Sequence, residues 1–260
     1  MTVNLLDFER TGFAQFCAEM GEKPFRARQL MRWIHQSGVD DFAAMTDISK
    51  ASREEMKKLA EIRAPAVVGD TTAADGTRKW LLEVGTGNAI ETVFIPERNR
   101  GTLCISSQAG CALACTFCAT GTMGLGRNLT DGEIVEQALR LARLLRDEQG
   151  AGVSNIVMMG MGEPFHNYDN VLAALRELND PQAFGLGARQ IAISTVGWIP
   201  GMDRLADEQL QFKLALSLHA PNDQVRSQLM PVTKRFPVSE LMRACGRYRR
   251  LGPSRFTVAP

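Results

Sequence analysis

The chain has 260 residues and a nearly balanced charge, with 30 Lys and Arg against 29 Asp and Glu and a formal net charge of +1. Hydrophobic residues make up 45% of it, enough for the core of one or two globular domains, and no apolar run is long enough to span a bilayer. The N-terminus, MTVNLLDFER, lacks the basic-then-apolar order of a secretory signal. Because four of the six cysteines gather in one stretch, a reducing compartment fits better than a disulfide scaffold, and we expect a cytoplasmic protein.

Residues 1–62 are predicted to form a small helical domain. Pro24 stands where a first helical turn tolerates proline, and apolar residues recur at near-helical spacing over 25–34. Ser52-x-x-Glu55 has the form of a capping box ahead of a further, charged helix. Several basic residues cluster in this domain beside Trp33, where they either meet phosphates or simply face solvent; they are Lys23, Arg26, Arg28 and Arg32.

Between 66 and 107 the hydrophobic pattern changes to a period of two, which is typical of strands. The runs VVGDTT, TRKWLLEV, AIETVFI and TLCISS are separated by turn-forming residues. The first three predict a β-meander that forms a linker over 63–98. The fourth begins a core domain over 99–260.

The stretch CISSQAGCALACTFCATGTMGLG, residues 104–126, carries the strongest chemical signal. Cys111, Cys115 and Cys118 follow the spacing C-x3-C-x2-C, and thiolates this close together favour a soft metal centre. Structural zinc usually takes two separated pairs of ligands, and no second pair follows here. An iron–sulfur cluster held by three cysteines leaves one iron open to a substrate.

Strands and helices alternate after the cysteines. A capping box, Thr130-x-x-Glu133, starts a helix that ends at Gly150. Strands are then predicted at NIVMMG, QIAISTVG, QFKLALSLHA and RFTVA, and helices over 169–179, 201–208, 222–230 and 237–250. Repeated β-α units predict a parallel sheet whose ligands collect at the carboxyl ends of the strands. Polar motifs stand at those ends: Gly162 and Glu163, Ser194, and Ser217-Leu218-His219.

Taken together, CISSQAGCALACTFCATG, ETVFIPE, MGMGEP, ISTVG and LALSLHAP resemble the RlmN branch of the RlmN/Cfr class of radical SAM RNA methyltransferases. The resemblance implies an α/β fold, a partial (βα)6 radical SAM barrel with about five strands, preceded by a helical accessory domain that helps to dock RNA. It also implies methylation of C2 of adenine in 23S rRNA and tRNA. The cofactors would be a [4Fe–4S] cluster and S-adenosylmethionine (SAM), with an electron donor such as flavodoxin, and the protein would act as a monomer without a membrane.

The resemblance also assigns the site. The cluster ligands would be Cys111, Cys115 and Cys118, and the SAM contacts Gly162, Glu163, Ser194, Ser217, Leu218 and His219. Cys104 would remove the C2 proton and take part in a transient disulfide, and Glu91 matches a position credited as proton acceptor. A polar strand face is the simpler account of Glu91.

One region departs from the family pattern. The family continues past RFTVAP to a terminal cysteine that carries the methyl group, and no such segment follows Pro260. Neither Cys17 nor Cys245 fits that role, because one lies in the helical domain and the other in an arginine-rich helix. We therefore expect a core domain that is incomplete at its C-terminus and makes no 2-methyladenosine until it is extended.

Two alternatives remain open from the sequence. The first is another radical SAM enzyme that uses the same cluster on a different substrate. The second is a non-catalytic module that binds RNA and holds zinc with Cys104 and the three clustered cysteines. Residues 221–260, with eight Lys and Arg against two acidic residues, are either a phosphate-binding surface or a solvated face.

Overall fold

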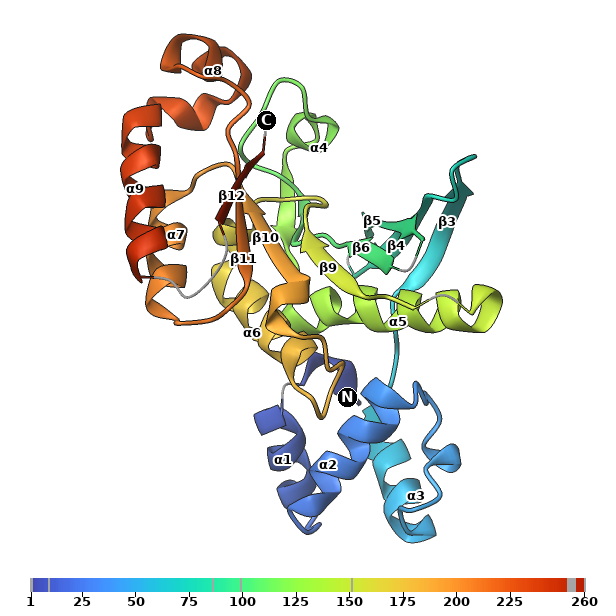
Figure 1. Ribbon diagram of the computed structural model, residues 1–260. Coiled ribbons are helices and arrows are strands. Elements are labelled where there is room, and N and C mark those ends of the chain that lie inside the picture. Colours follow the sequence, from blue (N-terminus) through green and yellow to red (C-terminus); the bar gives the residue numbers. More distant parts are fainter. Residues whose placement is uncertain are drawn as a thin grey trace.

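The computed structural model describes residues 2–8, 10–85, 87–98, 100–150, 152–251 and 256–259. Arg255, part of the basic segment, lies outside these ranges. Within them, one sheet of eight strands runs in the order β12-β11-β10-β9-β6-β5-β4-β3 (Figure 1). The expected parallel strands are confirmed and are β6 (Arg100–Cys104), β9 (Asn155–Met158), β10 (Ile191–Thr195), β11 (Lys213–Ser217) and β12 (Phe256–Ala259).

Helices cover one face of this sheet (Figure 1). They are α5 (Asp131–Gln149), α6 (Tyr168–Asn179), α7 (Ile199–Asp207) and α9 (Val238–Leu251), with α8 (Asp223–Leu229) at one end of the sheet. The predicted capping box of α5 is formed, because Thr130 and Glu133 each bond the other's backbone N–H. The same helix ends at Gly150, whose φ of 63° suits a residue without a side chain. Short 3₁₀ turns lie at Pro164–Asn167, Ala188–Gln190 and Pro231–Lys234.

The predicted meander extends the core sheet. Its antiparallel strands are β3 (Ala66–Thr72), β4 (Arg78–Val84) and β5 (Asn88–Glu97). Strand β5 also pairs with β6, with Val93 opposite Cys104, so the meander and the parallel strands share one hydrogen-bonded surface. The alternation that predicted these strands has its physical basis in Trp80, Leu82 and Ile90, which are fully buried in the main core.

The N-terminal residues form the expected helical unit, at the end of the molecule opposite α4 and α8 (Figure 1). Its helices are α1 (Arg10–Glu19), α2 (Phe25–Met31), a π-helical turn at Arg32–Gln36 and α3 (Lys50–Leu59), with 3₁₀ turns at Leu5–Asp7 and Phe42–Ala44. Strands β1 (Val3–Asn4) and β2 (Ala60–Glu61) pair and close the unit. The predicted cap was wrong by three positions: Ser49 caps α3 and accepts from the N–H of Ser52, which lies inside the helix.

In the parts of the chain that the structure describes, no helix combines the length and the apolar character needed to cross a bilayer.

A buried carboxyl group lies where the N-terminal unit meets α5. Glu136 is 3% exposed, and its Oε1 accepts a hydrogen bond of 3.2 Å from the side-chain amide of Asn4. Burial raises the pKa of Glu136 from 4.5 to about 9, so the folded chain keeps this proton at neutral pH. The unfolded chain releases it above 4.5, and stability therefore falls as pH rises from 4.5 to about 9.

Replacing Glu136 by Gln is expected to remove this pH dependence. Glutamine keeps an oxygen for Asn4 and has no proton to lose, so Glu136→Gln should be more stable than the unaltered protein at high pH and should lose that advantage toward pH 4.5. Urea unfolding between about pH 5 and about pH 9 measures the difference. Glu54→Gln, at an exposed position of α3, is the control and should show no such trend. A difference that stays constant with pH would mean that Glu136 ionises normally in the folded protein.

Candidate active site

The cysteine loop is closed at its neck by a hairpin that the sequence did not predict. Strands β7 (Gln108–Gly110) and β8 (Leu125–Asn128) pair antiparallel on either side of the loop. Gly110 has a φ of 84°, and a Cβ there would lie 2.0 Å from the carbonyl oxygen of Gly124. The N–H of Cys111 donates to that same oxygen at 2.8 Å. The glycines in the motif therefore let the two ends of the loop approach each other.

Backbone hydrogen bonds also fix the body of the loop. The N–H of Thr116 donates to the carbonyl of Leu229 at the end of α8 (2.9 Å), and the N–H of Cys118 to that of Cys115 (3.1 Å). The short helix α4 (Ala119–Thr122) begins directly after Cys118. Its Gly121 packs so closely that a Cβ would lie 3.0 Å from the backbone of Cys115. The three cysteines therefore lie on a constrained backbone.

The three cysteines and the carboxyl ends of β9, β10 and β11 bound a cavity of about 290 Å³. The structure thus brings together most of the site residues predicted from sequence. The polar lining is Cys111, Cys115, Cys118, Thr120, Gly160, Gly162, Glu163, Ser194, Thr195, Ser217 and His219, and the apolar lining Leu113, Phe117, Met158, Met159, Val196 and Met230. Leu218, Cys104 and Glu91 are outside this lining.

Glu163 connects the ends of two strands. Its backbone is extended, with φ −99° and ψ 113°, as predicted from Pro164. The carboxylate is 2% exposed and accepts from the hydroxyl of Thr195 (2.7 Å) and the N–H groups of Val196 (3.0 Å) and Phe165 (3.2 Å). Burial raises the pKa of Glu163 to about 7, and these three bonds oppose the rise. Since two carboxylate oxygens offer about four acceptor positions, room remains for one further donor.

Gln108 links the same turn to the hairpin. Its buried amide accepts from the N–H of Glu163 (2.9 Å) and donates to the side chain of Asn128 on β8 (2.7 Å). Gly162, with φ 99°, lies against it, and a Cβ there would meet the Cβ of Gln108 at 2.6 Å. Only glycine allows this approach, so the GEP turn and the cysteine hairpin are packed as one unit.

The remaining polar residues come from the ends of β10 and β11. The hydroxyls of Ser194 and Ser217 lie 3.1 Å apart. His219 has a φ of 57°, and its ring lies 4.8 Å from that of Phe117, the exposed aromatic before the last cysteine. Leu218 packs against the core and presents its carbonyl to Arg226, so it contributes backbone rather than a side chain to this region.

Arg226 is a buried cation that the sequence analysis placed on the surface. It is 0% exposed and donates to the carbonyls of Leu218 (3.0 Å) and Val196 and to the hydroxyl of Thr233 (2.9 Å). Its assignment to a phosphate-binding segment is therefore wrong. Arg247 is also engaged, in a bidentate pair with Asp203. No sequence signal distinguishes Arg226, because its partners come from three separate segments.

Cys104 and Glu91 share the half-exposed face of the sheet. Cys104 lies opposite Val93, and Glu91 is two residues from Val93, which places it diagonally about 7–8 Å from Cys104. Burial raises the pKa of the Cys104 thiol to about 11. The carboxylate of Glu91 accepts from the ammonium of Lys79 at 2.8 Å. All six cysteines carry free thiols.

The family model of the ribosomal RNA large subunit methyltransferase N-terminal domain matches residues 3–62, and that of the radical SAM superfamily matches residues 105–259. The chain belongs to the radical SAM superfamily. A solved structure described as a radical SAM methyltransferase from Sphaerobacter thermophilus is 42% identical, with a TM-score of 0.92. The match covers 98% of this chain and 75% of that chain. These similarities confirm an RlmN-like radical SAM methyltransferase, with the fold of a partial radical SAM barrel after an N-terminal accessory domain.

Radical SAM enzymes use a [4Fe–4S] cluster and SAM, and the cavity offers three thiols for the one and polar strand ends for the other. Burial raises the pKa of the Cys111 thiol, and it raises the pKa of the Cys115 thiol to about 11. The neighbouring thiols raise both pKa values further, and the charge of Arg226 lowers the pKa of Cys115. Such thiols give up their protons when a soft metal binds. Three cysteine thiols on one constrained loop are the donor set by which a [4Fe–4S] cluster is held when one iron has no protein ligand.

Arg226→Ala is expected to lower the free energy of unfolding of this radical SAM protein by about 3 kcal/mol, because three buried acceptors lose a charged donor. The free energy of unfolding of Arg226→Lys should lie between those of Arg226→Ala and the unaltered protein. Lysine keeps the charge, but its ammonium lacks the planar fork that reaches all three acceptors. Arg243→Ala, at an exposed position of α9, is the matched control, with an expected change below about 0.5 kcal/mol. Urea denaturation of the purified proteins measures all three. Equal free energies of unfolding for the Arg226→Ala and Arg243→Ala variants would contradict the view that Arg226 holds these three segments together.

Proposed function

We propose that this protein methylates C2 of adenine in 23S rRNA and tRNA. The observation that carries the proposal is the meeting of the three motif cysteines with the polar strand ends in one cavity, beside a sheet face that bears Cys104. The match of residues 3–62 to an N-terminal domain of ribosomal RNA methyltransferases supports RNA as the substrate.

In this proposal Cys111, Cys115 and Cys118 would hold the cluster, which would supply the electron for the reductive cleavage of SAM. Glu163, with acceptor capacity left over, and the backbone at Gly162 bind the ammonium group of SAM. The other polar contacts are Ser194, Ser217, Leu218 through its backbone, and His219. Because the cavity walls are mostly apolar, they limit the access of water to the reacting carbon.

Cys104 is proposed to remove the C2 proton and then to form a disulfide with the methyl-carrying cysteine that the family has in its terminal segment. Formation of the S–S bond would break that cysteine's S–C bond, so that the carbon stays on the adenine, takes up a proton and becomes the methyl group. Burial keeps its thiol protonated at rest, so it needs a proton acceptor before it becomes a base. Glu91 lies on the same sheet face and offers a carboxylate for that purpose. The two residues then have one task each: Glu91 receives the thiol proton and Cys104 receives the C2 proton.

The organisation proposed from the sequence gives each region a function. Residues 1–62 dock RNA, residues 63–98 connect, and residues 99–260 carry the chemistry. We also propose that the protein acts in the cytoplasm as a monomer and receives electrons from a donor such as flavodoxin.

Chromosomal substitution in the source organism tests the reaction. Cys111→Ser, Cys115→Ser or Cys118→Ser should abolish 2-methyladenosine in 23S rRNA and tRNA, measured by mass spectrometry of nucleosides. Cys17→Ala and Cys245→Ala are matched controls in which the modification should persist, because both thiols are buried in the core away from the cavity. Persistence of 2-methyladenosine in all three cluster variants would contradict the proposal. Loss of a different nucleoside, or 5′-deoxyadenosine formed by purified protein without methylated RNA, would favour another radical SAM reaction.

Cys104→Ala is expected to separate cluster assembly from methylation. The residue is outside the cavity lining, so iron content, visible absorption and SAM cleavage should match those of the unaltered protein, while 2-methyladenosine disappears from cellular RNA. Cys118→Ala, by contrast, should lose the cluster as well. A Cys104→Ala strain with normal 2-methyladenosine would remove this residue from the mechanism.

A further inference from the structure

Strand β6 leaves the sheet directly after Cys104, at the place where the neighbouring strand β5 carries Glu91. The last pair in the register of these strands is Val93 with Cys104. Two residues further along each strand, Ser106 would stand opposite Glu91. Instead, the N–H of Ser106 donates to the side chain of Gln137 on α5 (2.8 Å). The backbone of Glu91 therefore needs other partners on this side.

Two side chains take the place of the missing strand. The hydroxyl of Ser106 donates to the carbonyl of Glu91 (2.6 Å), and the thioether sulfur of Met161 accepts from the N–H of Glu91 (3.3 Å). The same hydroxyl accepts from the N–H of Met161 (2.9 Å). Met161 directly precedes Gly162 and Glu163, the residues proposed to bind SAM. The position of Glu91 is therefore tied to the turn that would hold the cofactor.

Ser106 is held in turn by α5. The amide of Gln137 accepts from the N–H of Ser106 and also donates to its carbonyl (2.9 Å), so it pairs with Ser106 as a neighbouring strand would. Both residues are fully buried. A Cβ at Gly160 would lie 2.6 Å from the hydroxyl oxygen of Ser106, which shows how closely the chain packs around that group. The hydroxyl therefore has little room to move.

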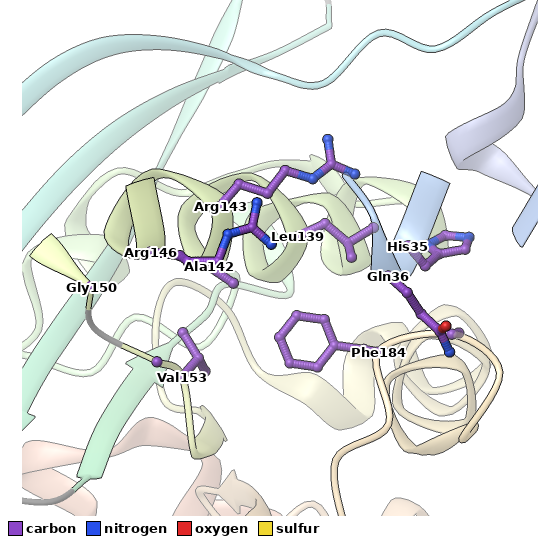
Figure 2. Close-up of a pocket in the computed structure, with 11 residues that line it drawn as sticks. His35, Gln36, Leu139, Ala142, Arg143, Arg146, Gly150, Val153 and Phe184 are labelled. Atoms are coloured by element: carbon purple, nitrogen blue, oxygen red, sulfur yellow. The ribbon is translucent and has the colours of Figure 1, made fainter. Parts of the chain in front are cut away.

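The helix that carries Gln137 is also joined to the N-terminal unit. The guanidinium group of Arg143 donates to the carbonyl of Ile34. Figure 2 shows this part of α5, with Leu139 and Arg143 beside a cavity of about 450 Å³ that the N-terminal unit helps to line. An amide on a helix that is packed in this way keeps one position, and precise site geometry depends on such support.

We propose that Ser106 is a positioning residue for the transfer of the thiol proton from Cys104 to Glu91. This inference rests on the proposed function, in which Glu91 receives that proton. The two residues lie diagonally about 7–8 Å apart on the sheet, and proton transfer needs their side chains within hydrogen-bond reach. Ser106 touches neither reacting group, but it fixes the backbone from which the carboxylate extends. A displacement of about 1 Å can slow a reaction about 100-fold.

Single-turnover kinetics of the holoenzyme, purified from strains of the source organism, test this role. In Ser106→Ala, 5′-deoxyadenosine should form at the normal rate, while 2-methyladenosine should form roughly 10- to 100-fold more slowly. The RNA should stay covalently attached to the protein in the interval, because the proposed adduct is released only after the C2 proton has left. Visible absorption of the cluster should be normal.

A double-mutant cycle distinguishes positioning from a purely structural role. Glu91→Gln should slow the release of 2-methyladenosine, and adding Ser106→Ala to it should slow the release no further, because Ser106 acts through Glu91. Met161→Leu keeps the apolar volume and removes the sulfur acceptor, so it should also slow the reaction and should also add nothing to Glu91→Gln. It provides a second variant that leaves the serine in place.

Ser154→Ala is the matched control. Its hydroxyl accepts from the N–H of Gly101 (3.0 Å) and donates to the carbonyl of the same residue (3.3 Å), at the other end of β6. Both rates should be unchanged in this variant.

A Ser106→Ala rate equal to that of Ser154→Ala would overturn the inference alone. A double variant that is slower than Glu91→Gln by the whole effect of Ser106→Ala would overturn it as well, because the hydroxyl would then act without Glu91. Full methylation by Glu91→Gln would refute the role of Glu91 in the proposed function, and the inference with it.

Discussion

The backbone of Val196 is held between a buried carboxylate and a buried guanidinium group. Its N–H donates to Glu163 and its carbonyl accepts from Arg226. Burying either charged group without such bonds costs several kcal/mol, so both are fixed by the partners that satisfy them. The turn after β10 therefore has one position relative to β9 and to the end of β11, and the cavity depends on that position for its shape.

Much of the fold could be predicted because its signals are local. Period-two runs predicted β3 to β6, and a capping box with a terminal glycine indicated both ends of α5. The topology rule that ligands collect at the carboxyl ends of parallel strands then predicted that Glu163, Ser194 and Ser217 would meet. Each of these inferences needs only neighbouring residues or the order of the strands.

The features that escaped prediction depend on contacts between distant segments. The β7–β8 hairpin has strands of three and four residues rich in glycine, too short for an alternating pattern. Arg226 looks like any polar residue on a short helix until Leu218, Val196 and Thr233 surround it. Ser52 matched a capping box, yet Ser49 took that place because the helix begins one turn earlier.

Helix α5 lies between the sheet and the N-terminal unit (Figure 1). Its first turn is joined to β8 beside the cysteine loop, through the bidentate pair of Arg127 with Glu133, and Arg146 lies in its last turn. Nineteen helical residues extend about 28 Å, and a helix packed along a sheet does not stretch. The helix therefore sets a fixed distance between the cysteine hairpin and its own last turn. An RNA docked on the N-terminal unit, as proposed above, would have to present its adenine at a set distance from the docked part, so target choice would depend on RNA shape as well as on the base that is modified.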